Sequence, residues 1–478
     1  MYEKNYTLIQ VLESWHANEG VFSNDEILSW INERNNTAKV NIEKTEFLSD
    51  GKWFYDESAG RIVNCNRTFF SISGIIKEKN GQIVQEQPII IQPEIGYLGI
   101  ICKEINGVLH FLMQAKIEPG NINKIQISPT IQATKSNFMQ AHGGKVPPYL
   151  EYFYHKHDYE VVYDQIQSEQ SSRFYEKRNR NIVIKLSKDV GIEILPSHKW
   201  MTLGQIKHFM TIDNLVNMDT RTVISGLPFS LHDFSYKEMV YMQSLVPDSA
   251  FFNSIFDNTN CGKINKIYQY MNEQKMLDDS KVKFVDLYKL NNWKLIDNRE
   301  FSSKRGDFKI VYCNIAIEGR EVQNWSQPLF ESKGKSLFGL AYVEKHGKYR
   351  FLVRAFSEIG CFDKIEIGPT VQIPPVYDKD KLNSVEKVFL ECYEHKESVL
   401  QEGIFSEEGG RFYHEENRNV ILKFNDYDMP LPEGYFWLDF YSLNVLIQFN
   451  NCLNIQLRNL LSMLNLDYAA VCVGGRDK

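Results

Sequence analysis

Residues 108–137 read VLHFLMQAKIEPGNINKIQISPTIQATKSN. Polar residues alternate with apolar ones through the first ten positions, which predicts a β-strand with one face on a core and His110, Gln114 and Lys116 on the other. A Pro-Gly-Asn turn at 119–121 then ends the strand, because proline has no backbone N–H and glycine and asparagine tolerate turn dihedrals. The segment closes on hydroxyl and amide residues, which suit a polar-ligand site or an ordinary solvated loop equally well.

The same pattern returns at residues 348–377, KYRFLVRAFSEIGCFDKIEIGPTVQIPPVY. Gly368-Pro369-Thr370 stands in register with Ser128-Pro129-Thr130, and Arg411-Phe412-Tyr413 later repeats Arg173-Phe174-Tyr175. Solenoid repeats are roughly 20 to 50 residues long. This much longer repeat therefore predicts two tandem globular domains.

The repeat divides the chain into four parts. We expect an N-terminal helical arm over residues 1–40, a first repeat over 41–230, a connecting segment over 231–290 and a second repeat over 291–478. Each repeat contains strand patterns followed by apolar residues spaced at three and four, as in WMTLGQIKHFMTIDNLVNMDTR. The predicted fold class is therefore α+β, with mixed strands followed by helices that cover the sheet.

Composition narrows the classes of partner. The chain has 478 residues, with 54 Lys and Arg against 61 Asp and Glu, and its net charge is −7. Such a balance provides no broad positive field for nucleic acid or an anionic membrane, so an anion must be held by local donors. The eight cysteines show no CxxC spacing, which argues against a zinc site or a disulfide framework.

Targeting signals and common cofactor motifs are not recognisable. No apolar run approaches the roughly 18 residues of a membrane helix, and the start does not resemble a signal peptide, so we expect a cytoplasmic protein. There is no G-x-G-x-x-G or G-x-S-x-G, and Gly334-Lys335-Ser336 lacks the earlier glycine of a P-loop. His155 and His157 have no matching third ligand, so we expect no metal and no cofactor.

Several groups of donors are doubled across the repeats. Arg350 and Arg354 occupy the polar face of the second strand, where their planar forks suit a diphosphate, although a solvated sheet face is the simpler alternative. The passage from Glu169 to Arg180 is rich in charge and fits either a binding site or a structural ion-pair network. Trp53 and Trp293 are able to stack on a base or to pack in a core.

Longer blocks carry a family resemblance. QAKIEPGNINKIQISPTIQATKSNF, HGGKVPPYLEYF, QSEQSSRFYEKRNRN and WMTLGQIKHFMTIDNLVNMDTR, with SEEGGRFYHEENRN in the second half, resemble the NDP-hexose 2,3-dehydratases of deoxysugar biosynthesis. The resemblance covers nearly all of the chain after residue 40. It implies a tandem duplication of a Nudix-like domain, a homodimer, a dTDP-4-keto-6-deoxyglucose substrate and a nucleotide-sugar pocket in each repeat.

The resemblance also sets the expected chemistry. A ketone at C4 acidifies the C3 proton, so a base removes it, an acid helps the C2 hydroxyl leave, and a 3,4-diketo-2,6-dideoxy sugar results without a redox carrier. A downstream 3-ketoreductase would consume that product. The second copy departs from the first at 357–360 and 373–375, so we expect the first pocket to be catalytic.

The resemblance and the doubled donors together give the candidate residues. The catalytic candidates are Lys116, Glu118, His142, Tyr149 and Glu169 as acid and base groups, with Arg173 and Arg178 as stabilisers of an enolate or diphosphate. The substrate-binding candidates are Trp53, Gln114, Asn121, Gln132, Thr134, Lys135, Ser136, Asn137, Ser168, Ser172, Trp293, Arg350, Arg354, Glu408, Gly409, Gly410, Arg411 and Tyr413. The alternatives are a non-catalytic nucleotide-sugar binding protein and a Nudix-type diphosphate hydrolase, although no Nudix box of clustered glutamates is present.

Overall fold

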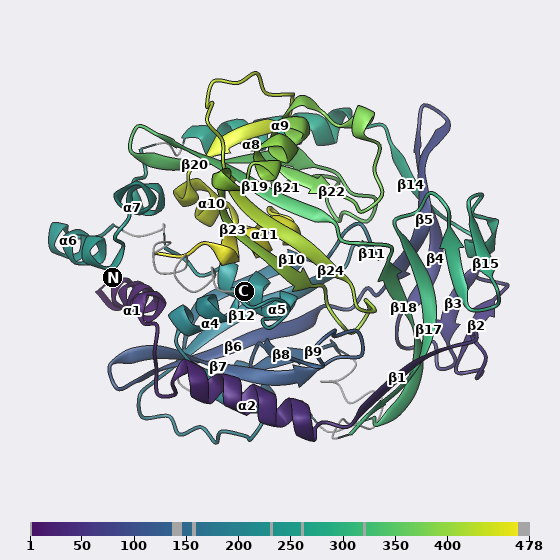
Figure 1. The fold of residues 1–478 in the computed structure, drawn as a ribbon, viewed down its shortest axis with the longest axis horizontal. Coiled ribbons are helices and arrows are strands. Elements are labelled where there is room, and N and C mark those ends of the chain that lie inside the picture. The colour runs from purple at the N-terminus through teal and green to yellow at the C-terminus, as the bar shows by residue number, and fades with distance from the viewer. Residues whose placement is uncertain are drawn as a thin grey trace.

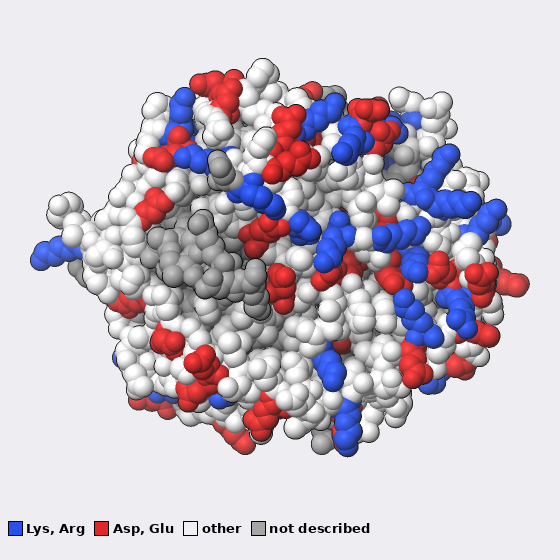
Figure 2. All heavy atoms as spheres, in the orientation of Figure 1, with Lys and Arg blue, Asp and Glu red and all other residues white. Residues whose placement is uncertain are grey.

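A computed structural model describes residues 2–135, 146–154, 159–229, 233–259, 262–318 and 322–466. Two seven-stranded mixed sheets form most of the molecule, and two smaller sheets lie together at one side (Figure 1). The structure is therefore α+β with mixed sheets, as the sequence predicts. On the face shown in Figure 2, acidic and basic side chains are interspersed, most densely over the small sheets.

The two large sheets share one strand order. The first runs β10-β12-β6-β7-β13 and the second β23-β24-β19-β20-β25, with a parallel pair in the middle of each. The strands of the first sheet are β6 (Gly96–Ile105), β7 (Val108–Ile117), β8 (Ile125–Ser128), β9 (Ile131–Ala133), β10 (Tyr159–Ser168), β12 (Arg178–Leu186) and β13 (His198–Met201). Those of the second are β19 (Leu337–Lys345), β20 (Lys348–Phe356), β21 (Glu366–Gly368), β22 (Val371–Ile373), β23 (Val399–Ser406), β24 (Glu416–Lys423) and β25 (Tyr435–Leu438).

The repeated Pro-Thr dipeptide has a packing role. The Thr130 hydroxyl donates to the Leu112 carbonyl on β7 and accepts from the Ile101 N–H on β6. The Thr370 hydroxyl makes the same two bonds: it donates to the Leu352 carbonyl on β20 and accepts from the Ala341 N–H on β19. A buried hydroxyl of this kind satisfies ladder groups where two strands diverge, which explains why the motif appears in both halves.

The small sheets are linked by an exchange of strands. The first contains β2 (Trp53–Asp56), β3 (Arg61–Asn64), β4 (Ser71–Lys79), β5 (Gln82–Ile91) and β11 (Phe174–Tyr175), and the second β15 (Trp293–Ile296), β16 (Glu300–Ser303), β17 (Phe308–Ile317) and β18 (Asn324–Ser332). β1 (Val40–Thr45) belongs to the first half but pairs with β17, while β14 (Lys281–Val285) pairs with β4. A helix precedes each exchanged strand, α2 (Asn24–Thr37) and α8 (Gly262–Leu277).

Helices fill the space between the two large sheets (Figure 1). They are α4 (Leu203–Phe209), α5 (Met218–Ser225), α10 (Phe440–Leu446) and α11 (Ile455–Met463), and α5 packs against α11. Thr202 caps α4, so the predicted helix begins only after β13 has ended. Arg221 of α5 donates to the Ser406 carbonyl, and Arg458 of α11 donates to the Ser168 carbonyl. Each helix is therefore bonded to the end of a strand in the opposite half, β23 or β10.

The remaining helices lie around this body. They are α1 (Tyr2–His16), α6 (Tyr236–Leu245), α7 (Ser249–Phe256), α9 (Ser384–Glu394) and the short 3₁₀ turns η1 (Leu150–Phe153), η2 (Leu287–Lys289), η3 (Lys379–Lys381) and η4 (Lys396–Ser398). Among the described residues, no helix combines the length and apolarity needed to cross a membrane.

Candidate active site

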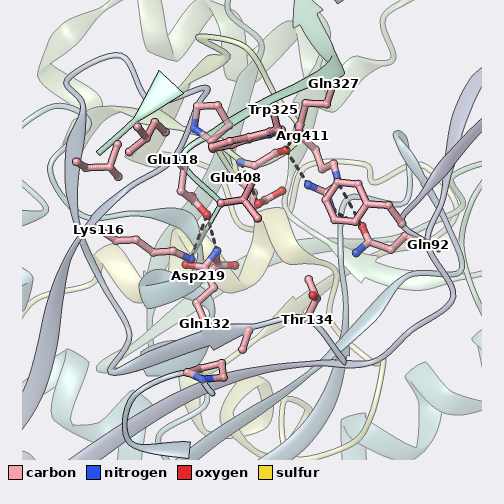
Figure 3. Close-up of a pocket in the computed structure, with 18 of the residues that line it drawn as sticks. Gln92, Lys116, Glu118, Gln132, Thr134, Asp219, Trp325, Gln327, Glu408 and Arg411 are labelled. Atoms are coloured by element: carbon pink, nitrogen blue, oxygen red, sulfur yellow. Dashed lines mark hydrogen bonds and ion pairs between the residues drawn. The ribbon is translucent and has the colours of Figure 1, made fainter. Parts of the chain in front are cut away.

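A cavity of about 880 Å³ lies where the first large sheet meets the second half of the chain. One wall comes from β6, β7 and β9 of the first half, and the opposite wall comes from β18 and the loop that follows β23 (Figure 3). Neither half alone encloses this space.

The end of β7 supplies a buried ion pair. Lys116 and Glu118 project to the same side because they are two residues apart on an extended chain, and their Nζ and Oε1 atoms are 3.2 Å apart. Gln132 on β9 donates to the same Glu118 oxygen at 2.9 Å, and Asn217 donates to Gln132 at 3.3 Å. These donors hold Glu118 in one orientation facing the cavity (Figure 3).

The Pro-Gly turn after β7 brings the second half over this pair. The Gly120 N–H donates to the Gly409 carbonyl at 2.7 Å, and the His414 N–H donates to the Gly120 carbonyl at 2.9 Å. A side chain at position 120 would overlap the Phe412 carbonyl oxygen, so only glycine permits this approach. The contact sets Glu408 and Arg411 over the cavity.

Three further carboxyl groups face the same end. Asp219 and Glu169 are 1% and 5% exposed, and Glu408 is partly exposed to the cavity. Burial raises the pKa of all three, and neighbouring carboxylates add to the effect, bringing the pKa of Glu408 to about 7. Burial likewise lowers the pKa of the Lys177 ammonium, which lines the cavity beside them. A proton can therefore reside on Glu408 near neutral pH, and the shifts at Asp219 and Glu169 favour their protonated forms.

The other end of the cavity is aromatic and cationic. Arg411 donates through Nε and Nη2 to Gln92 Oε1 at 3.2 and 3.0 Å, and its guanidinium stacks on Phe69 and Phe70. Trp325 of β18 is only partly buried and lines the cavity between Glu118 and Arg411 in the view of Figure 3. A planar ring and a fixed guanidinium in one recess suit a base and a phosphate.

Gln327 ties these groups together. It accepts from Trp325 Nε1 at 2.9 Å and donates to the Gly410 carbonyl at 2.7 Å. The Arg411 Nη1 donates to that same carbonyl at 2.8 Å. The ring and the guanidinium therefore hold a fixed relative position before any ligand binds.

The sequence profile of the NDP-hexose 2,3-dehydratase family matches residues 24–227 and 264–464. This chain belongs to the NDP-hexose 2,3-dehydratase family. Each matched segment runs from the helix before an exchanged strand, α2 or α8, to the end of the helices between the large sheets.

Three relatives in this family are named dTDP-4-dehydro-6-deoxy-alpha-D-glucopyranose 2,3-dehydratase. The Saccharopolyspora spinosa protein is 35% identical over 454 residues, covering 94% of this chain and 93% of its own length. The Streptomyces violaceoruber protein is 34% identical over 443 residues, covering 91% and 95%. The Amycolatopsis orientalis protein is 32% identical over 451 residues, covering 92% and 90%.

In this family member, part of the predicted set meets in the cavity. The residues that line it are Lys116, Glu118, Glu169, Trp53, Gln114, Gln132, Thr134, Glu408, Gly410 and Arg411. Trp53 is nearly fully buried and its Nε1 donates to the Ser326 carbonyl at 2.8 Å, so little of its ring is available to a ligand.

Several predicted arginines lie elsewhere. Arg173 pairs with Asp307 at 3.1 Å, and Arg178 stacks on the Phe362 ring. Arg350 pairs with Asp439 and Arg354 with Glu386, both at 2.9 Å. None of the four lines the large cavity, so their predicted contacts with a diphosphate or enolate have no counterpart in its described lining.

Other predicted residues also lie outside the cavity lining. The Tyr149 hydroxyl donates to the Glu193 carbonyl at 3.0 Å and accepts from the Leu195 N–H at 2.9 Å. The residues Asn121, Lys135, Ser168, Ser172, Gly409, Tyr413 and Trp293 do not line it either, and Trp293 borders a separate cavity of about 260 Å³. Ser136, Asn137 and His142 lie outside the described residues.

The prediction missed Gln92, Lys177, Asn179, Asp219, Trp325 and Gln327, which all line the cavity. Differences between the aligned halves would have pointed to Asp219, because the matched helix carries Gln456 at that position between its shared asparagine and arginine. No comparable signal marks Trp325, since its role depends on how β18 is placed beside the first half.

Proposed function

We propose that this protein is a dTDP-4-keto-6-deoxyglucose 2,3-dehydratase. The relatives that share more than nine-tenths of the chain are named for this activity. The observation that carries the proposal is the single cavity that joins the Lys116–Glu118 pair and buried carboxyl groups to an aromatic and cationic recess.

The two ends of the cavity suggest how the substrate lies. The thymine ring stacks on Trp325 and the diphosphate meets Arg411, since a base needs a flat apolar face and a phosphate needs a guanidinium. The hexose then extends toward Glu118 and Gln132 at the end of β7. Lys52 and Lys177 also line the cavity and add positive potential along this path.

Glu118 acts as the base. Its Oε1 accepts from the Lys116 ammonium and the Gln132 amide, and both contacts hold the carboxyl group toward the hexose end of the cavity. It removes the C3 proton, and the electron pair moves to the C4 oxygen as an enolate. The Lys116 ammonium lies beside it and stabilises that oxyanion, the type of interaction that contributes most to such rates.

The first pocket is the catalytic one. Phe356 stands in the second half where Lys116 stands in the first, because β7 and β20 pair in the same register with β6 and β19. Pro374 likewise replaces Thr134, and Gln456 replaces Asp219. The second half therefore lacks the ammonium and one carboxyl group that the proposed reaction uses.

The finer features of the family resemblance complete the proposal. Each half is a Nudix-like domain, which the shared strand order of the two large sheets supports. The protein acts as a cytoplasmic homodimer, and light scattering at micromolar concentration tests the dimer. A 3-ketoreductase consumes the product, because a vicinal diketone is reactive.

Incubation with dTDP-4-keto-6-deoxyglucose and an ortho-phenylenediamine trap, followed by mass spectrometry, tests the activity. A dehydratase yields the quinoxaline adduct of a sugar that has lost one water. A non-catalytic binding protein leaves the substrate mass unchanged, and a diphosphate hydrolase releases dTMP and a sugar phosphate. Either of those two results refutes the proposal.

A variant pair locates the activity. Lys116→Met is expected to lower kcat by about 100-fold or more, because it removes a preorganised charge from the reaction centre. Lys188→Met is the control, since its side chain is 66% exposed and pairs with Glu104 outside the cavity. Equal rates for both variants contradict the assignment of Lys116.

A further inference from the structure

We propose that Asp219 is the general acid that protonates the departing C2 hydroxyl, a role that rests on the proposed dehydratase function. Asp219 lies in the first turn of α5, is 1% exposed and lines the cavity. Figure 3 shows it beside Lys116 and Gln132, at the end of the cavity assigned to the hexose.

One oxygen of the Asp219 carboxyl group makes no hydrogen bond to the described residues. Asp219 Oδ2 has no hydrogen-bond partner among the described residues, although it is fully buried from bulk solvent. An unsatisfied buried polar atom destabilises the folded protein, and a catalytic role is one reason to retain it. A sugar hydroxyl is a suitable partner because it both donates and accepts.

The surroundings of Asp219 favour its protonated form. Burial raises its pKa well above the usual value, and the carboxyl groups of Glu169, Glu118 and Glu408 raise it further, each from a different segment. Lys116 on β7 lowers this pKa, but burial and the three carboxyl groups have the larger effects. The N-terminus of α5 also favours the ionised form. Arg221 of the same helix is directed to the Val216 and Ser406 carbonyls.

The second half provides an internal comparison. Asn217 caps α5 and Asn454 caps α11, and each helix then carries an arginine directed into the opposite half. At the position of Asp219, α11 has Gln456, whose Oε1 is also buried without a partner among the described residues. The two helices thus have the same cap and the same buried arginine, and only α5 has a carboxyl group, that of Asp219, which can transfer a proton.

The proton balance closes without a further reagent. Glu118 takes the C3 proton, the enolate pair returns to rebuild the C4 carbonyl, and a C2–C3 double bond forms as the C2–O bond breaks. The Asp219 proton joins the leaving oxygen, and one water departs. The enol then becomes the ketone as C2 receives the proton held by Glu118 and the C3 hydroxyl returns one to Asp219.

A substrate whose C2 substituent leaves without a proton separates this role from a structural one. In the 2-deoxy-2-fluoro analogue of dTDP-4-keto-6-deoxyglucose, fluoride departs as the anion. Asp219→Asn is expected to slow dehydration of the natural substrate by about 100- to 10,000-fold, because a general acid contributes that much. Fluoride release is expected to change by less than about tenfold.

Three results overturn the proposal. Equal losses with both substrates would assign Asp219 a structural role, and an unchanged dehydration rate would place the acid elsewhere. If Asp219→Asn does not fold, the pH–rate profile of the unmodified protein decides. The rate with the hydroxyl substrate should fall at high pH and fluoride release should not, so a shared fall in both contradicts the role. Failure of the unmodified protein to dehydrate at all refutes the proposed function instead.

Discussion

Replacing Gly120 by alanine tests the contact on which the cavity depends. The added Cβ would overlap the Phe412 carbonyl oxygen and crowd the Gly409 carbonyl. The turn after β7 and the loop that carries Glu408 and Arg411 must then separate by more than about 1 Å, and a misplacement of that size costs about 100-fold in rate.

The same change weakens the fold. Two backbone hydrogen bonds, from Gly120 N–H to Gly409 and from His414 N–H to Gly120, are strained or lost. At about 1 kcal/mol each, with the steric clash in addition, the free energy of unfolding should fall by about 2 to 4 kcal/mol.

The assay measures kcat/KM with the diamine trap and the unfolding free energy by denaturant titration, on protein that remains folded. Gly191→Ala is the control, because its Cβ would meet nothing within 4 Å. A Gly120→Ala protein with the control's rate would show that the loop from the second half does not position catalytic groups.

Three further predictions concern separate features. Trp325→Ala should weaken dTDP binding by about 1 to 3 kcal/mol in calorimetry, since base stacking contributes that much, and an unchanged Kd would remove Trp325 from the base site. Tyr149→Phe removes the hydrogen bonds to Glu193 and Leu195, so it should lower the free energy of unfolding by about 1 to 3 kcal/mol. It should leave kcat unchanged, and a 100-fold loss of kcat would make Tyr149 catalytic. Burial raises the pKa of Glu415 from 4.5 to about 8, so the folded protein favours the protonated carboxyl group. The free energy of unfolding should therefore fall by about 1.4 kcal/mol per pH unit as the pH rises between those two values. Denaturant titration across that window should give a shallower slope for Glu415→Gln, and equal slopes would refute this account.

The sequence predicts the parts of the fold that local chemistry determines. The strand before Pro119 and the α+β class follow from periodicity. The shared Pro-Thr motif is visible because its hydroxyl serves the same ladder bonds in each half. The exchange of β1 and β14 between the small sheets cannot be predicted from the sequence, because the residues of a strand do not show which strand far away in the chain it pairs with.

Functional residues are harder to predict than the fold, because identical residues at matching positions of the two halves make different contacts. Arg173 and Arg411 occupy matching positions, yet Arg173 pairs with Asp307 while Arg411 bonds to Gln92 and lines the cavity. Arg350 and Arg354 likewise meet acidic partners on other elements. These partners lie far away in the sequence, so a charge suited to phosphate was indistinguishable from half of an ion pair.

A crystal structure with dTDP-glucose tests the central claim most directly, because this ligand lacks the C4 ketone and cannot react. We expect its base on Trp325, its diphosphate at Arg411, and its C2 and C3 atoms within reach of Asp219 and Glu118. The account would be contradicted if ligand density appeared only in the smaller cavity, the one lined by Trp293, and the large cavity were empty.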